Sequence, residues 1–134
     1  MTGKGKIMAD NSSEHHFALT VSIAIEALKA LLIVNGGAAT ALIALTGKAQ
    51  DGPNYGLAIL LFGLAALLNA VTLIVGYFSQ LAYANHRFAR EQQDMDEAEK
   101  KFKAHCACQY WAIAFLAASL AASAAGMFFA FRAI

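Results

Sequence analysis

The chain has 134 residues, of which 59% are hydrophobic and 14% are charged, and its formal net charge is +1. Soluble domains are about 45–50% apolar and about 25% charged, so the composition excludes an ordinary water-soluble globular domain. The charge is nearly balanced and gives no strongly basic surface, so no nucleic-acid partner is expected.

Three long windows of the sequence contain almost no charged side chain. Each is close to the ~20 residues that a helix needs to cross the hydrocarbon core of a bilayer. The predicted spans are residues 28–47, 55–77 and 110–131. Because three apolar core helices would have almost no polar shell in so short a chain, residues 1–134 are predicted to form one all-α membrane domain. Its three transmembrane helices would form an antiparallel bundle.

The first helix is predicted over residues 13–47, after a disordered tail of residues 1–12. Ser12 and Ser13 are typical N-cap residues, because a hydroxyl oxygen accepts a hydrogen bond from a free N–H group of the first turn. The helix would then continue without a break into the first span.

Two opposite charges lie at the start of this span, Glu26 and Lys29. Residues three apart share one face of a helix, so we interpret them as an interfacial ion pair whose lysine extends toward the lipid headgroups. The alternative is a functional charge inside the membrane, which would mark a site for an ion or a substrate.

Two adjacent glycines, Gly36 and Gly37, interrupt the first span, although each costs a helix about 1 kcal/mol relative to alanine. A tight turn at residues 51–54 would bring them opposite Ala65 and Ala66 of the second span. Helices in lipid associate largely through close contact of small residues. The glycines are therefore predicted to pack the first span against the second.

The third span carries a similar small-residue face, in which Ala118, Ala122 and Gly126 recur every four residues. Spacing of this kind places the residues on one stripe of a helix. The stripe packs either against the chain's own helices or against another copy in a homo-oligomer.

A polar layer is predicted in the middle of the bundle, where Asn35, Asn69 and Ser119 fall at similar heights. One interpretation is that these side chains form hydrogen bonds across the helices, each worth about 0.6–2 kcal/mol. The other is that the amides line a water-filled path. Three helices cannot enclose such a path alone, so this second interpretation requires oligomerisation.

The second and third helices, residues 55–92 and 94–131, extend past the membrane as a helical hairpin. The turn is predicted at residues 92–94, because Asp94 followed by Glu97 is a capping-box pattern. A turn centred at residue 94 sets two pairs of interfacial aromatic residues at one level. These are Tyr77 and Phe78 against Tyr110 and Trp111.

The distribution of lysine and arginine predicts the orientation of the chain. Most of these residues lie before the first span or between the second and third spans, and the opposite side holds only Lys48 and Arg132. Basic residues near span ends stay on the cytoplasmic side. The N-terminus and the hairpin are therefore predicted to be cytoplasmic, and the C-terminus to be outside.

Histidine and cysteine side chains gather on the predicted cytoplasmic side. His16, His86, His105 and Cys108 are ligand types suited to zinc or haem iron, although their spacing follows no standard metal motif. The alternative is that they are interfacial histidines and reduced thiols. No cofactor is predicted, and a metal site is kept as a hypothesis.

The sequence contains no nucleotide-binding loop, no dinucleotide glycine pattern and no hydrolase or metalloprotease motif. It is not predicted to be an enzyme.

Two short motifs resemble those of a class of short three-span bacterial inner-membrane proteins to which no function is assigned. The motifs are Glu26-x-x-Lys29-x-Leu31-Leu32-x-x-Asn35-Gly36-Gly37-Ala38-Ala39 and Phe78-Ser79-Gln80-x-x-Tyr83-x-Asn85. The resemblance covers the first two spans and implies a bacterial inner membrane, without implying an activity.

Three functions remain open at this point. The first is a non-catalytic accessory subunit or self-assembling scaffold, which binds copies of itself or a membrane protein through small-residue faces and the hairpin. The second is a holin-like or channel-like homo-oligomeric pore. The third is a protein that handles a metal or haem. In each, the protein sits in the lipid bilayer.

Overall fold

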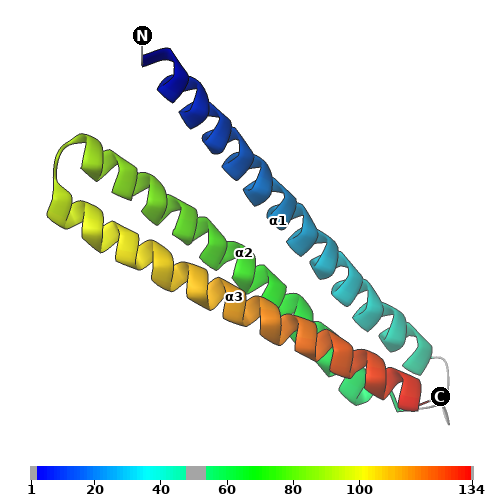
Figure 1. The fold of residues 1–134 in the computed structure, drawn as a ribbon. Helices are drawn as coiled ribbons and strands as arrows, with labels where there is room; N and C mark the ends of the chain where they lie inside the picture. The colour runs from blue at the N-terminus through cyan, green and yellow to red at the C-terminus, as the bar shows by residue number, and fades with distance from the viewer. Residues whose placement is uncertain (1–2, 48–53, 134) are drawn as a thin grey trace.

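The computed structural model describes residues 3–47 and 54–133, with side chains described from residue 18 onward. It contains three helices, α1 (Gly3–Thr46), α2 (Gly56–Glu91) and α3 (Met95–Arg132) (Figure 1). Each includes a stretch that is long and apolar enough to cross a membrane, which for α1 is Ala18–Thr46. The prediction of an all-helical chain with three such helices is confirmed.

The start of α1 differs from the prediction. The helix begins at Gly3, so the tail predicted for residues 1–12 is helical from that point and Ser12 and Ser13 lie inside the helix rather than at its cap. Serine is preferred at N-caps, but it does not by itself end a helix, and no proline interrupts this segment. The outer turn predicted at residues 51–54 falls mostly outside the described residues.

A tight turn joins α2 to α3. The carboxylate of Asp94 accepts a hydrogen bond of 3.0 Å from the backbone N–H of Glu97, so it caps α3 as the capping pattern predicts. The backbone N–H of Asp94 also donates to the carbonyl oxygen of Ala89 at 3.0 Å. Between these elements, Gln93 has a φ of 61°, in the left-handed region that glycine adopts most easily.

Replacing Gln93 with glycine is therefore expected to stabilise the hairpin by up to about 1 kcal/mol, since a non-glycine residue in this conformation is strained by about that amount. Urea unfolding of the detergent-solubilised protein, followed by circular dichroism, would measure the change. Gln92→Gly is the matched control, because Gln92 has a φ of −82° and gains nothing from glycine. Equal effects of the two changes would contradict the prediction.

The register of the hairpin is shifted by one helical turn from the prediction. Three interhelical hydrogen bonds join residue 65 to 119, residue 79 to 105 and residue 86 to 98, and each pair is symmetrical about residue 92 rather than 94. Asp94 caps α3 instead of forming the centre of the turn. The predicted pairing of the aromatic residues is therefore wrong by about four positions. All four remain exposed: Tyr77, Phe78, Tyr110 and Trp111.

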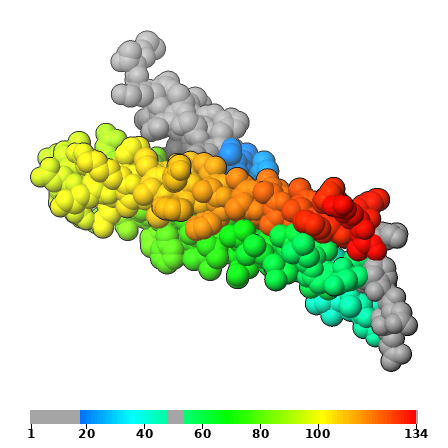
Figure 2. Space-filling model, turned by 90° about the horizontal axis from the view of Figure 1, so that it is seen from below, coloured from blue at the N-terminus to red at the C-terminus, as the bar shows by residue number. Residues whose placement is uncertain are grey.

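The hairpin packs along its whole length, whereas α1 contacts it over only part of its length. Figure 2 shows α2 and α3 side by side, and Figure 1 shows α1 close to them near its C-terminal end and increasingly distant toward its N-terminal end. The side chains of Asn35 and Ser123 link α1 to α3. The contact of α1 therefore begins near the middle of its apolar stretch.

The interior of the bundle is built mainly from small and polar side chains, while the large apolar side chains point outward. Ile33 is 73% exposed and Phe131 is 80% exposed. Small residues inside and bulky apolar residues outside are typical of helices that associate within lipid. The buried residues are Asn35, Ala58, Phe62, Ala65, Asn69, Thr72, Ser79, Ala89, Ala98, Ser119, Ala122 and Gly126.

Candidate functional site

The three side chains of the predicted polar layer are all buried between the helices. Asn35 is 2% exposed, and Asn69 and Ser119 are fully buried. The Ser119 hydroxyl donates to the carbonyl oxygen of Ala65 at 2.9 Å, and this bond ties α3 to α2. The Ser123 hydroxyl lies 2.9 Å both from Oδ1 of Asn35 and from the carbonyl oxygen of Ser119.

The sequence interpretation missed Ser123, although it stands one helical turn after Ser119 and shares its face. Ser123 is the residue that connects Asn35 to α3, so the layer consists of two serines of α3 and one asparagine from each of the other helices. The four-residue spacing of Ser119 and Ser123 could have predicted that both serines belong to the layer.

Both asparagine amides retain unsatisfied hydrogen-bonding groups. Nδ2 of Asn35, Nδ2 of Asn69 and Oδ1 of Asn69 are buried and form no hydrogen bond within the part of the chain that the structure describes. A buried polar group without a partner costs about 1–3 kcal/mol. Asn69 contributes two such groups, so it is the least favourable buried side chain of the layer.

Small residues form a close contact in α3 but not in α1. A Cβ atom added to Gly126 would lie 3.3 Å from the ring of Phe62, and Ala65 and Ala122 are also buried. At Gly36 and Gly37, by contrast, an added Cβ would meet no atom within 4 Å. Contrary to the prediction, these two glycines therefore do not pack closely against α2.

The rotation of α1 about its own axis explains why the two glycines do not contact α2. Asn35 faces the hairpin, and successive helical residues are about 100° apart, so Gly36 and Gly37 turn progressively away from it. Gly37 is exposed. Of the other predicted packing residues, Ala66 is half-buried and Ala118 is exposed.

The ion pair predicted at the start of the first span is present in the structure. Nζ of Lys29 lies 2.8 Å from Oε1 of Glu26, and the two side chains are 54% and 69% exposed. Such an exposed pair contributes little stability in water. Its effect here is to neutralise both charges on the surface of an apolar helix.

Four rings, from Tyr83, His86, Phe102 and His105, pack together where the hairpin extends beyond its most apolar part. The ring centroids of Tyr83 and His105 are 5.2 Å apart, and those of His86 and Phe102 are 5.3 Å apart. Each histidine thus lies against an aromatic ring of the opposite helix.

Hydrogen bonds to the backbone hold both histidines of this cluster. Nδ1 of His86 lies 2.7 Å from the carbonyl oxygen of Ala98, and Nδ1 of His105 lies 2.9 Å from that of Ser79. A carbonyl oxygen can only accept, so Nδ1 carries the hydrogen in both rings. The Ser79 hydroxyl, 3.4 Å from the carbonyl oxygen of His105, donates in return.

This arrangement does not favour the predicted metal site. Among the side chains described by the structure, no three histidine, cysteine, aspartate or glutamate residues are grouped so as to hold a metal ion. His86 and His105 belong to the ring cluster, Cys108 does not join them in such a group, and the side chain of His16 lies outside the described residues. The histidines instead fasten α2 to α3.

The tip of the hairpin carries charges of both signs on α3. Lys101 pairs with Glu97 at 3.1 Å, and Lys103 pairs with Glu99 at 2.7 Å. The hydrogen bond and the charge of Lys103 lower the pKa of the Glu99 carboxyl. The tip therefore presents mixed, locally paired charges rather than a surface of one sign.

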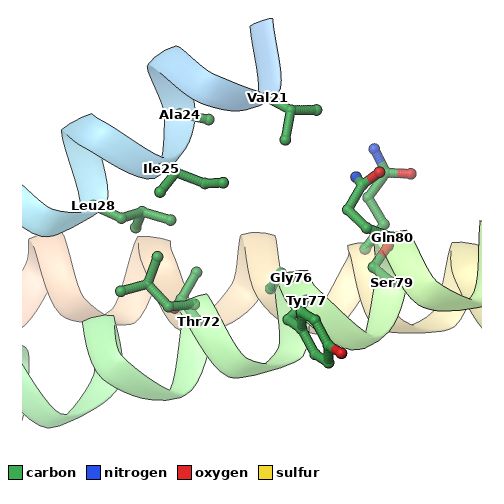
Figure 3. Close-up of a pocket in the computed structure, with 12 residues that line it drawn as sticks. Val21, Ala24, Ile25, Leu28, Thr72, Gly76, Tyr77, Ser79 and Gln80 are labelled. Carbon is green, nitrogen blue, oxygen red and sulfur yellow. The ribbon is translucent and has the colours of Figure 1, made fainter. Parts of the chain in front are cut away.

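A cleft of about 590 Å³ lies where α1 diverges from the hairpin (Figure 3). Its walls are mainly apolar, and α1 contributes Val21, Ala24, Ile25 and Leu28. The opposite wall contains Thr72, Leu73, Gly76, Tyr77, Ser79 and Gln80 of α2 together with Gln109 and Ala112 of α3. The sequence interpretation did not predict this cleft.

Comparisons of the chain with family models, with curated proteins and with solved structures find no match, so the candidate sites are interpreted from their own geometry.

Proposed function

We propose that the protein is a non-catalytic integral membrane protein that assembles with copies of itself and presents its hairpin tip to the cytoplasm. The three helices are long and apolar enough to cross a bilayer. The lysines in the N-terminal part of α1 and the lysines and arginines around the hairpin tip support a cytoplasmic N-terminus and an outer C-terminus. Placement in an inner membrane rests on the resemblance of two short motifs in this chain to those of short bacterial membrane proteins.

The open surface around Gly36 and Gly37 is the observation that carries the self-assembly proposal. Both glycines lie within the apolar stretch of α1, and neither makes a close contact inside the single chain. Glycine in a helix interior costs about 1 kcal/mol relative to alanine, so the monomer gains nothing from them. In lipid, such a surface allows the backbone of a second helix to approach closely.

The hairpin tip is proposed as a cytoplasmic surface for a protein partner. From residue 78 to residue 91, α2 would extend about 20 Å beyond the membrane interface at 1.5 Å per residue. The ring cluster and the cap at Asp94 hold this extension together. Its mixed charges do not suit binding to nucleic acid, which requires a basic surface.

The pore hypothesis is not favoured by the position of the polar layer. Asn35 and Asn69 are buried within one chain, at 2% and 0% exposure, whereas amides that line a path between copies would face outward. A metal-handling function has no support in the described side chains. Self-assembly through α1 is therefore the function that we propose.

Replacing Gly37 with leucine tests this proposal. We expect the oligomer to dissociate on the order of ten times more readily, because the larger side chain separates the two helix backbones; this corresponds to about 1.4 kcal/mol. Native mass spectrometry of the protein released from nanodiscs would measure the oligomer. Since an added Cβ at Gly37 meets no atom within 4 Å, the fold of the single chain should not change.

Gly63→Leu is the matched control, since Gly63 in α2 is also exposed and also has open space around its Cα. Gly63 stands between the bulky Phe62 and Leu64, however, so it does not form a surface of adjacent small residues. It should leave the oligomer intact. A monomeric wild type, or a Gly37→Leu oligomer as stable as the wild type, would refute self-assembly through this surface.

A further inference from the structure

The cleft between α1 and the hairpin has a clear polarity along its length. Leu28 of α1 and Thr72 of α2 lie at one end of the cleft, whereas Gln80 lies at the other end (Figure 3). The side-chain amides of Gln80 and Gln109 form no hydrogen bond with other described residues. The cleft therefore offers mainly apolar walls along its length and an uncommitted amide, that of Gln80, at one end.

The volume of the cleft is smaller than that of two turns of a helix. A helix with its side chains is about 10–12 Å across, so even two turns of a docked helix would fill roughly 850–1,200 Å³. The cleft holds about 590 Å³, which is within the range of about 300–1,000 Å³ for small-ligand pockets.

The position of the cleft points to the source of its ligand. Its walls belong to helices that are apolar enough to span a bilayer, and exposed Tyr77 marks the membrane interface beside it. A ligand that enters sideways from the bilayer would have its chain toward the membrane interior and its polar group toward the cytoplasmic face. A phospholipid has this arrangement.

We propose that the cleft binds one diacyl phospholipid of the cytoplasmic leaflet, with an acyl chain between α1 and α2. The ester carbonyl groups accept hydrogen bonds from the side-chain amides of Gln80 and Gln109. The proposal rests on the membrane placement of the helices, but it does not depend on self-assembly. The bound lipid fills the space that the divergence of α1 leaves open.

Photo-crosslinking tests the site directly. The full-length protein is placed in nanodiscs of phosphatidylethanolamine and phosphatidylglycerol that contain a phospholipid with a diazirine on its acyl chain, and crosslinked positions are mapped by mass spectrometry. We expect crosslinks at Ala24, Leu28 and Leu73. Membrane insertion is checked first by resistance of the protein to alkaline extraction, so that failure to insert is distinguished from failure to bind lipid.

Gly76→Leu is the variant that blocks the site. An added Cβ at Gly76 meets no atom within 4 Å and the residue lines the cleft, so the leucine side chain is expected to enter the space proposed for the lipid. Crosslinking inside the cleft should fall on the order of tenfold, a change of about 1.4 kcal/mol in binding. Gly63→Leu, on the same helix but away from the cleft, should leave it unchanged.

Three outcomes would overturn the proposal. The first is labelling confined to outward-facing side chains such as Leu60, which is 62% exposed. The second is equal labelling of the cleft in the Gly76→Leu and Gly63→Leu proteins. The third is a tightly held lipid of another class, such as an isoprenoid quinone, identified by its mass after gentle release.

Discussion

Gly126→Leu should lower the free energy of unfolding by about 1–3 kcal/mol, because the added side chain has no space between α3 and α2. A Cβ at this position would lie 3.3 Å from Cδ2 and Cε2 of Phe62 and 3.4 Å from Cβ of Leu61. Phe62 is only 7% exposed, so its ring has little room to move away from a larger side chain. The helices of the hairpin would have to separate.

The measurement is unfolding of the protein in mixed micelles with increasing SDS, followed by circular dichroism. Gly63→Leu provides the reference, since it gives the same gain in helix propensity without a contact at the new Cβ. If both variants unfolded at the same SDS fraction, the close approach of α2 and α3 at Gly126 would be disproved.

Asn69→Leu should raise the free energy of unfolding by about 1–3 kcal/mol, even though it removes a polar residue from the centre of the bundle. Both Nδ2 and Oδ1 of Asn69 are buried without a hydrogen-bond partner among the described residues. Leucine has a similar volume and brings no polar group that needs a partner.

Asn35→Leu is the informative comparison, because the Oδ1 of Asn35 lies 2.9 Å from the hydroxyl of Ser123. Losing that bond should offset part of the gain, so the same SDS titration should rank Asn69→Leu as the more stable variant. A destabilised Asn69→Leu protein would show that the amide has a partner of real energetic value.

The sequence predicts the helices of this protein much better than it predicts their rotation. Charge-free windows of spanning length identify all three helices, and the Asp94–Glu97 pattern locates the turn. Both signals are local, since they depend on residues within one element or one turn. Such signals remain valid whatever the arrangement of the helices.

Rotation and register depend on contacts between elements, and here the sequence is less informative. A helix in lipid is apolar on every face, so hydrophobicity does not distinguish the buried side of α1 from its outer side. The polar residue Asn35 marked the buried side, whereas Gly36 and Gly37 were wrongly expected there. Placing the turn two residues late at Asp94 shifted the whole hairpin register by one helical turn.

The divergence of α1 has no local signal at all. Nothing in the composition of residues 18–30 indicates that this half of the apolar stretch stands away from α2, and so the cleft lined by Gly76 and Gln109 was not predicted. Gaps of this kind follow from the crossing angle of two helices, which depends on packing along their entire contact.

The outward placement of the bulky side chains reverses the usual map of mutational tolerance. In a soluble protein, surface positions vary freely in polarity and core positions vary little in size. Here an outer position such as Ile33 should tolerate any apolar side chain but few charged ones. Inner positions such as Ala65 and Gly126 should not tolerate a side chain that is larger by even one or two methyl groups. Selection on this chain should therefore conserve small side chains at inner positions. At outer positions it should conserve only apolar character, so that the identity of each outer residue can vary.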